Sequence, residues 1–166
     1  MNKLKYLFIC CLVLYSFSSC VKDYITLNKA ILVNETAHDI SIFIFKKGGL
    51  ANRDSIAINA HDSVVILQGT SKGEKAGVDW QGATGAFKNT GDSVIVIFDN
   101  NFPVTHYYQY SPESIYRAEK YYLFSSSRNV LNLDNFILNQ EKLTKHKYEN
   151  ILRYRFAEQD YEYAKD

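Results

Sequence analysis

The chain contains little cysteine, little proline and no large excess of charge of either sign. It has three Cys, two Pro and eight Gly among 166 residues, against 14% aromatic residues, which excludes a disordered tail and predicts a folded domain. The 19 basic and 18 acidic residues give a formal net charge of +1. A chain with this balance lacks the excess of positive charge that binds nucleic acid, so no nucleic-acid partner is expected.

The first twenty residues form a distinct segment. Lys3 and Lys5 precede an apolar block at 6–17, which is shorter than the about 20 residues that a membrane-spanning helix needs. The small residues Ser18 and Ser19 and the thiol of Cys20 follow it. This order of charge, apolar core and small residues is typical of a secretion signal. The alternative is a buried N-terminal helix, which is less favoured.

The positions of the three cysteines support this interpretation. Cleavage before Cys20 would remove Cys10 and Cys11 and leave one thiol, so no disulfide could form within the mature chain. An unpaired exposed thiol is a chemical liability in an oxidising compartment. Acylation of Cys20 would remove that liability, and two or more acyl chains would anchor the protein stably to a membrane.

Phe17-Ser18-Ser19-Cys20 resembles the lipobox of bacterial lipoproteins, and Phe at its first position is similar to the relaxed box of Bacteroidetes lipoproteins. The resemblance covers about the first twenty residues. It implies a small lipoprotein of the cell envelope, with a diacylglyceryl group on Cys20 and residence in the outer membrane. Surface-exported members tend to carry an acidic cluster after the cysteine. Val21-Lys22-Asp23-Tyr24 has one acid and one base, which favours a periplasm-facing protein.

The sequence therefore predicts three parts: a signal peptide at 1–19, an acylated cysteine with a tether at 20–29, and a single domain at 30–166. Removal of the signal takes away Lys3 and Lys5 and no acid, which leaves 17 basic and 18 acidic residues. A mature chain of this length suits one domain with one core.

The domain is predicted to be all-β, an antiparallel β-sandwich that is immunoglobulin-like or related. Short apolar and β-branched runs alternate with turn formers, as expected for strands and hairpins. The expected strands of the first half are 31–33, 40–45, 54–58, 62–67 and 92–98. The first two should form a hairpin, and 69–91 a glycine-spaced loop. The run 92–98 is apolar from Val94 onward, which predicts a central strand covered on both faces.

The second half lacks glycine and is expected to be less regular. A short strand is predicted at 104–108, followed by a short helix from Ser111 to Lys120, because Ser-Pro-Glu is a typical helix start. The segment 129–139 is ambiguous between strand and turn. Apolar and charged residues alternate over 148–156, which predicts a half-buried strand. A short acidic turn or helix at 157–164 should follow it.

No motif indicates catalysis, a cofactor or a metal site. The four histidines, His38, His61, His106 and His146, lack metal-ligand spacing and are expected in loops. Adjacent residues such as His61-Asp62-Ser63 cannot usually form a hydrolase relay. A non-catalytic domain is therefore preferred. The alternative, a small envelope hydrolase acting on glycan or peptide, would need His61, Asp79 or Glu113 to converge with other polar groups in a cleft.

Aromatic residues give the best candidate for a binding surface. Tyrosine offers flat apolar area with a polar tip, which suits glycans, peptides or partner proteins. The candidate residues are Trp80, Tyr107, Tyr108, Tyr110 and Tyr116, and the four tyrosines belong to a tyrosine-rich stretch that also contains Tyr121 and Tyr122. The alternative, which is favoured, is that these tyrosines pack against a sheet edge, since tyrosine is a strong strand former. The sequence thus predicts a membrane-anchored binding or scaffolding domain whose partner is a glycan or an envelope protein.

A three-residue pattern, Asp-Ser-aliphatic, recurs at the start of three expected strands. It places serines at 55, 63 and 93. Turn chemistry explains the pattern well, because Asp and Ser accept local backbone hydrogen bonds. The pattern also resembles the O-glycosylation acceptor of exported Bacteroidetes proteins, which would make Ser55, Ser63 and Ser93 acceptors.

Overall fold

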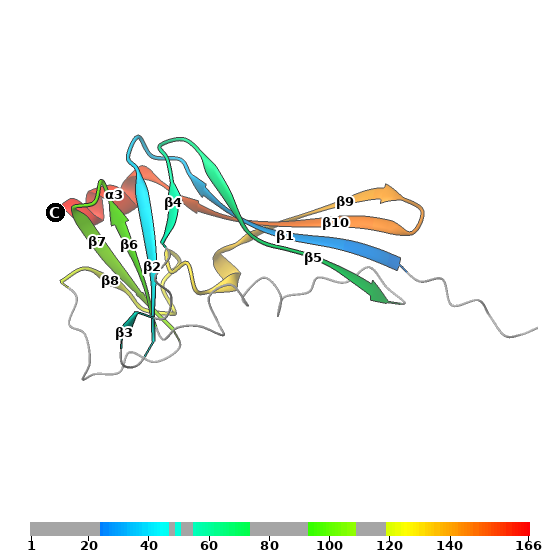
Figure 1. Ribbon diagram of the computed structural model, residues 1–166, viewed down its shortest axis with the longest axis horizontal. Coiled ribbons are helices and arrows are strands. Elements are labelled where there is room, and N and C mark those ends of the chain that lie inside the picture. The colour runs from blue at the N-terminus through cyan, green and yellow to red at the C-terminus, as the bar shows by residue number, and fades with distance from the viewer. Residues whose placement is uncertain (1–23, 47–48, 51–54, 74–92, 109–118) are drawn as a thin grey trace, which may run out of the picture.

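The computed structural model describes residues 24–46, 49–50, 55–73, 93–108 and 119–166. The structure is mostly β: two mixed sheets pack together, and one short helix ends the chain (Figure 1). The prediction of an all-β, two-sheet domain is confirmed at this level. Among the described residues, no helix combines the length and apolar character needed to cross a membrane.

The first sheet has four strands in the order β5-β1-β10-β9. Their bounds are Ser63–Gly73 for β5, Tyr24–Asn34 for β1, Lys147–Phe156 for β10 and Ile137–Thr144 for β9. β1 and β10 run parallel, with Ile25 opposite Lys147 and Asn34 opposite Phe156, whereas the other pairs are antiparallel. The prediction of a purely antiparallel sheet is therefore wrong here. The first and last strands pair across the whole sequence, and local patterns carry no information about such a pairing.

The second sheet has six strands, in the order β3-β2-β6-β7-β8 with β4 also paired to β2. Their bounds are Gly49–Leu50 for β3, Ile40–Lys46 for β2, Ser93–Phe98 for β6, Phe102–Tyr107 for β7, Tyr121–Tyr122 for β8 and Ile56–Ile58 for β4. β6 lies between β2 and β7, so its predicted central position is confirmed. Ile95 and Ile97 are only half-buried, however, so one face of β6 is incompletely covered.

The segments expected to form the first hairpin lie in different sheets. β1 ends at Asn34 and β2 begins at Ile40, and the chain passes from one sheet to the other between them. The Asn34 side chain stabilises this crossover: its amide donates to the carbonyl oxygens of His38 at 2.6 Å and Asn59 at 3.0 Å. Its carbonyl oxygen accepts from the Thr36 hydroxyl at 2.7 Å. These bonds satisfy polar groups that are buried where the chain crosses from one sheet to the other.

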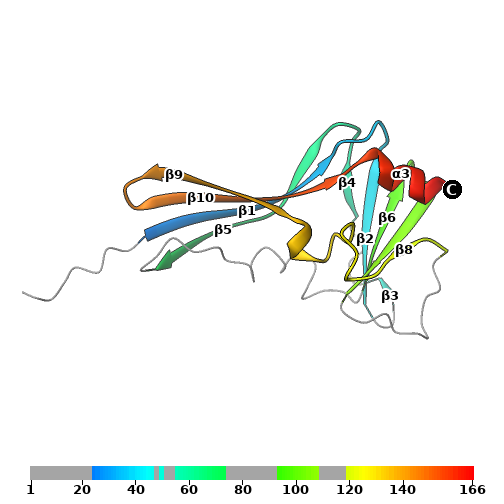
Figure 2. The ribbon, with the colours of Figure 1, turned by 180° about the vertical axis from the view of Figure 1, so that it is seen from behind.

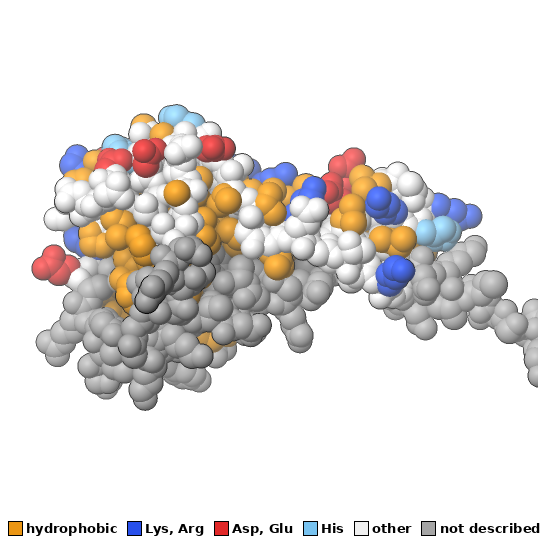
Figure 3. All heavy atoms as spheres, viewed as in Figure 1, with side chains coloured by type: hydrophobic (Ala, Val, Ile, Leu, Met, Phe, Trp, Pro, Cys, Tyr) orange, Lys and Arg blue, Asp and Glu red, His pale blue; other side chains and the backbone are white. Residues whose placement is uncertain are grey.

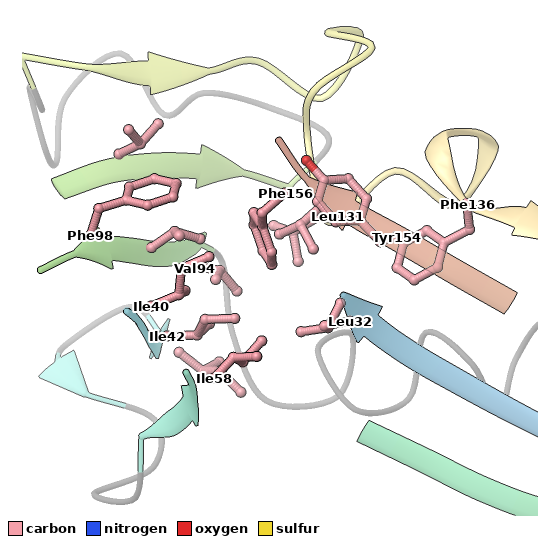
Figure 4. Close-up of a cluster of buried hydrophobic side chains, with 14 of the residues drawn as sticks. Leu32, Ile40, Ile42, Ile58, Val94, Phe98, Leu131, Phe136, Tyr154 and Phe156 are labelled. Atoms are coloured by element: carbon pink, nitrogen blue, oxygen red, sulfur yellow. The ribbon is translucent and has the colours of Figure 1, made fainter. Parts of the chain in front are cut away.

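The core lies between the two sheets at one end of the molecule (Figure 4). Its largest fully buried side chains include Leu32 and Phe156 from the first sheet, and Ile40 and Phe98 from the second. The Phe98 and Phe156 rings meet edge to face at 6.5 Å. Burial of each large apolar side chain contributes roughly 1.5–3 kcal/mol, so this layer is the main source of stability.

Beyond Ala30 and Leu152 the four-stranded sheet continues away from this core (Figures 1 and 2). We call this part the arm; it comprises 24–29, 68–73 and 139–151. We call the remaining described residues the body. On the face of β1 that carries Ala30 and Leu32 in the body, the arm carries the buried polar residues Thr26 and Asn28. The residue type changes from apolar to polar where the second sheet ends.

Hydrogen-bonded side chains cross the arm from one edge strand to the other. The chain of bonds runs from Gln140 Nε2 to Asn150 Oδ1 at 2.9 Å, from Asn150 Nδ2 to Asn28 Oδ1 at 2.9 Å, and from Asn28 Nδ2 to Ser71 Oγ at 3.2 Å. Asn150 and Asn28 are 0% and 4% exposed. Every strand of the sheet contributes one side chain, so these bonds join all four strands.

Several strand and helix boundaries differ from the sequence-based expectations. β1 begins at Tyr24, so most of the expected tether at 20–29 is strand. β5 continues to Gly73 instead of giving way to a loop at Gly69. β9 falls partly in the ambiguous segment and was not expected beyond it. Strand pairing explains these extensions: each segment completes a ladder with β1 or β10.

The end of the chain agrees with expectation. The half-buried strand predicted over 148–156 is β10, where Leu152, Tyr154 and Phe156 are buried and Arg155 is exposed. The helix α3, Glu158–Lys165, follows it. A 3₁₀ turn, Leu133–Asn135, precedes β9. The short helix expected at 111–120 lies outside the described residues, apart from its last two positions, which form a bend.

Candidate functional site

Tyrosine and phenylalanine rings gather where β7, β8 and α3 meet. The members of this aromatic cluster are Tyr107, Tyr108, Tyr121, Tyr122, Phe124 and Tyr163. Tyr122 and Tyr163 stack at 4.9 Å, and the Lys120 ammonium lies 5.4 Å from the centre of the Tyr163 ring. The Tyr163 hydroxyl donates to the backbone oxygen of Tyr121 at 3.0 Å, which joins α3 to β8.

Of the predicted binding residues, two tyrosines are packed against neighbouring rings and the other three residues lie outside the described part of the chain. Tyr107 is only 5% exposed, and Tyr108 is half-buried with its ring against Phe124 at 5.6 Å. Trp80, Tyr110 and Tyr116 lie outside the described residues. For Tyr107 and Tyr108 the packing alternative is thus the better description of the side chains.

Two residues of this region are exposed: Tyr121, which belongs to the tyrosine-rich stretch, and Leu123, which the sequence did not single out. Tyr121 is 46% exposed and Leu123 is 45% exposed, on either side of Tyr122 in the chain. Tyr121 contacts the buried Tyr107 ring at 6.0 Å. Tyr121 stands within a tyrosine-rich sequence, but among the described strands β8 lies at the edge of its sheet, next to β7 alone, which explains the exposure of Tyr121. This edge is the described surface best suited to contact a partner.

An ion pair behind the aromatic cluster holds α3 in place. The Asp160 carboxylate, 2% exposed, accepts from Arg128 Nε at 2.8 Å and forms a second, shorter bond with Arg128 Nη2. It also accepts the backbone N–H of Ala157 at 2.9 Å at the start of α3. The Tyr122 hydroxyl donates to Asp160 at 3.3 Å. Burial and the adjacent Asp160 carboxylate raise the pKa of Tyr122 well above its usual range, so Tyr122 stays protonated as a donor.

His106 lies in β7 and is 2% exposed, which corrects the expectation that each histidine is a loop residue. Its Nδ1 accepts the backbone N–H of Val130 at 3.0 Å, and its ring meets Tyr122 edge to face at 5.2 Å. Burial, with a smaller contribution from Arg128, lowers the pKa of His106 to about 3. The imidazole is therefore neutral at physiological pH and serves as a hydrogen-bond acceptor in the core.

His38 connects three segments at the end of the body away from the arm. Its Nδ1 lies 2.6 Å from Asp99 Oδ2 in the β6–β7 turn, and its Nε2 lies 3.4 Å from Glu158 Oε1 on α3. The His38 ring stacks on Tyr161, with ring centres 3.4 Å apart. Asp99 also accepts the backbone N–H of Asp39 at 3.1 Å. This arrangement anchors the crossover and the turn to the helix.

The other residues considered for chemistry lie apart or cannot be placed. His61 is in the β4–β5 turn with a positive φ of 57°, and Asp79 and Glu113 lie outside the described residues. In the described part of the chain, no group of three or more His, Cys, Asp or Glu side chains could hold a metal ion. The convergence of these residues in a cleft, which would favour a hydrolase, stays a prediction.

The three predicted glycan acceptors differ in accessibility. Ser55 and Ser63 are exposed, whereas Ser93 is 7% exposed at the start of the central strand β6, opposite Tyr107. Glycosylation of Ser55 and Ser63 stays a prediction that the folded surface permits. At Ser93 a glycan could be attached only before β6 joins its sheet.

Comparison with known proteins gives no relative from which a function could be taken. No protein-family model matches the chain, and no match is found among curated proteins or solved structures. The functional argument therefore rests on the chain's own residues and geometry.

Proposed function

We propose that this protein is a lipoprotein of the bacterial cell envelope, anchored through acylated Cys20, whose body acts as a non-catalytic binding or scaffolding domain. The outer membrane, on its periplasmic side, is the proposed location. Support for the anchor comes from the charged start, the short apolar block and the lipobox-like Phe17-Ser18-Ser19-Cys20. The finer description of the fold as an immunoglobulin-like sandwich is likewise a proposal, supported by two sheets that share one core.

The observation that carries the proposal is the position of β1 within the molecule. β1 begins at Tyr24, four residues after Cys20, at the end of the arm that is farthest from α3 and the C-terminus (Figure 1). At about 3.3 Å per residue, its 11 residues span roughly 36 Å. A lipid on Cys20 would therefore lie at one end of the molecule and the body at the other. The arm then acts as a spacer between membrane and body.

The surface proposed to contact a partner is the β8 edge, with Tyr121 and Leu123 as its exposed residues. Ion-paired and stacked residues, Arg128, Asp160 and Tyr163, support this edge from behind. An aromatic ring held rigidly at a sheet edge loses little conformational entropy on binding. A glycan or an envelope protein is the proposed class of partner.

Metabolic labelling tests the anchor. The full chain is produced in a Bacteroidetes host that is fed an alkyne-tagged fatty acid, and the mature protein is analysed by gel fluorescence and intact mass. We expect label and a lipid-sized mass increase in the wild type and neither in Cys20→Ser. The matched control is the double variant Cys10→Ser/Cys11→Ser, which should be processed and labelled normally because both residues lie in the leader. A mature protein with an unmodified Cys20 thiol would refute the anchor.

A further inference from the structure

The outer end of the arm carries a net positive charge, bordered by the acids Glu141 and Glu149. We call this end the tip; it comprises 24–26, 70–73 and 142–148. Its four lysines are Lys72, Lys142, Lys145 and Lys147, and these ranges contain no Asp or Glu. Figure 3 shows blue and pale-blue side chains gathered there. Within the described residues, none of these lysines forms an ion pair, in contrast to Lys29, which pairs with Glu149 at 2.7 Å.

Strand register brings two of these charges close together on one face. Ile25 lies opposite Lys72 on one side and Lys147 on the other, so the two lysines share a face two strand spacings, roughly 10 Å, apart. Lys142 lies opposite Tyr148 and therefore on the other face of the sheet, and Lys145 lies in the β9–β10 turn at the end of the arm. Like charges at this spacing repel one another, and nothing in the packing of the arm requires them. A partner of opposite charge would offset the repulsion.

Apolar and aromatic side chains accompany the lysines. Ile25 is 36% exposed and Leu143 is 41% exposed. The Tyr24 ring contacts His146 at 5.3 Å and Tyr148 at 5.8 Å. Lysines with long apolar stems, tyrosines and exposed aliphatic side chains together are typical of surfaces that lie at a membrane–water interface.

The tip is also the part of the described chain nearest in sequence to Cys20. The link from Cys20 to Tyr24 reaches at most about 14 Å when fully extended. If Cys20 carries the lipid, as the proposed function states, the tip must lie within that distance of the bilayer. The adjoining residues Lys22 and Asp23 cancel in charge, as do Glu74 and Lys75, and Glu149 pairs with Lys29. Glu141 offsets one of the four lysines, so the tip keeps a net positive charge.

From the charge, the apolar residues and this position we infer that the tip binds the surface of a bilayer containing anionic phospholipid. The four lysines contact the phosphate-bearing headgroups, and Ile25 and Leu143 insert between them. The tip of the arm then contacts the membrane surface, and this contact fixes the orientation of the body relative to the bilayer. Each lysine near an anionic surface strengthens binding about fivefold, so the loss of two should weaken docking about 25-fold.

Lysine footprinting tests this inference on the full chain as its host processes it. The purified protein is reconstituted into vesicles of phosphatidylcholine alone or of phosphatidylcholine with phosphatidylglycerol. An amine-acetylating reagent then reports the reactivity of each lysine by mass spectrometry. We expect severalfold protection of the four tip lysines in the anionic vesicles only, relative to Lys120 and Lys165 of the body. High salt should remove the protection because it screens the charges.

A matched pair of double variants assigns the effect to the tip. Lys72→Gln/Lys147→Gln should remove most of the protection of Lys142 and Lys145, whereas Lys120→Gln/Lys165→Gln should leave it intact. Equal reactivity of the tip lysines in both kinds of vesicle would overturn the inference. So would equal protection by soluble polyglutamate, because the tip would then recognise acidic polymers in general.

The same sample separates this inference from the proposed anchor. Intact mass reports whether Cys20 carries lipid. If it does not, the anchor fails, and flotation of the unacylated protein with the anionic vesicles measures the tip alone. Salt-sensitive flotation that the Lys72→Gln/Lys147→Gln variant loses would support the inference, and absence of flotation would overturn it.

Discussion

The side-chain amide of Asn150 donates to the side-chain oxygen of Asn28 at 2.9 Å, between the parallel strands β10 and β1. The two residues are 122 positions apart in the sequence, and both are buried. Their bond is the central one of the three side-chain hydrogen bonds that join the four strands of the arm. The arm lacks the apolar core of the body, so these polar contacts contribute much of the stability of its strand pairing.

Removal of the Asn150 side chain should destabilise the protein. Asn150→Ala leaves the buried Asn28 Oδ1 without its donor, which costs about 1–3 kcal/mol, whereas the exposed Gln140 can bond to water instead. We expect a loss of about 1–3 kcal/mol in the free energy of unfolding, measured by urea denaturation. The control is Asn139→Ala, an exposed position on β9, which should change stability by less than about 0.5 kcal/mol. Equal effects of the two substitutions would contradict this account.

The sequence predicts those strands whose apolar residues form a clear local pattern. β10 alternates, with Leu152, Tyr154 and Phe156 on one face, whereas β2 and β6 are nearly continuous apolar runs, and the structure confirms all three. β9 could not be identified this way because all eight of its residues are exposed. It is a strand because β10 offers an edge to pair with, and that information lies elsewhere in the chain.

Which face of a strand the fold covers is likewise a tertiary property. Tyr107 and Tyr121 both belong to the tyrosine-rich stretch, for which packing is the favoured alternative to a binding surface, yet Tyr107 is buried and Tyr121 is exposed. Both are good strand residues, and only the position of β7 inside the sheet and of β8 at its edge separates them. For His106 the sequence does offer a signal, because this residue lies within the strand predicted at 104–108, and in the structure Val104 to Tyr107 are all buried.

The buried ion pair between Arg128 and Asp160 should contribute more to stability than an exposed one. Asp160→Asn removes the negative charge and leaves the Arg128 guanidinium, whose side chain is 25% exposed, without its counter-charge. We expect a loss of about 2–4 kcal/mol, somewhat less than for a fully buried pair, measured by chemical denaturation.

The matched control for this pair is Arg155→Gln, which breaks an ion pair with Glu35 in which both side chains are at least 42% exposed. Exposed pairs contribute about 0–1 kcal/mol, so this variant should be nearly as stable as the wild type. If Asp160→Asn proved as mild as Arg155→Gln, α3 would not depend on the Arg128 contact.

Substitutions at Tyr107 and Tyr121 should separate stability from binding. Tyr107→Ala removes a ring that is only 5% exposed, and we expect a loss of about 3–5 kcal/mol in the free energy of unfolding, as for other large aromatic residues. Tyr121→Ala combined with Leu123→Ala should leave the fold largely intact but weaken contact with a partner. Photo-crosslinking in cells from a reactive residue at position 121 measures that contact, with position 139 as the comparison. Identical crosslinks from both positions would remove the β8 edge as the contact surface.

The buried histidine should make the protein less stable in acid, through a mechanism that a single substitution isolates. Burial lowers the pKa of His106 to about 3 in the folded protein, against about 6.5 when the chain is unfolded. Between these two values the unfolded chain binds a proton that the folded protein does not, so the free energy of unfolding falls as pH decreases through this window. The contribution of His106 is complete above pH 6.5, declines by up to roughly 1.4 kcal/mol per pH unit below it, and levels off near pH 3.

The substitution His106→Asn tests this mechanism, because asparagine keeps an acceptor for the Val130 N–H without a titrating ring. Urea denaturation across the same pH range should therefore give a shallower decline for the variant than for the wild type. Parallel pH profiles for wild type and His106→Asn would show that acid acts on other groups, and that the imidazole does not resist protonation in the core.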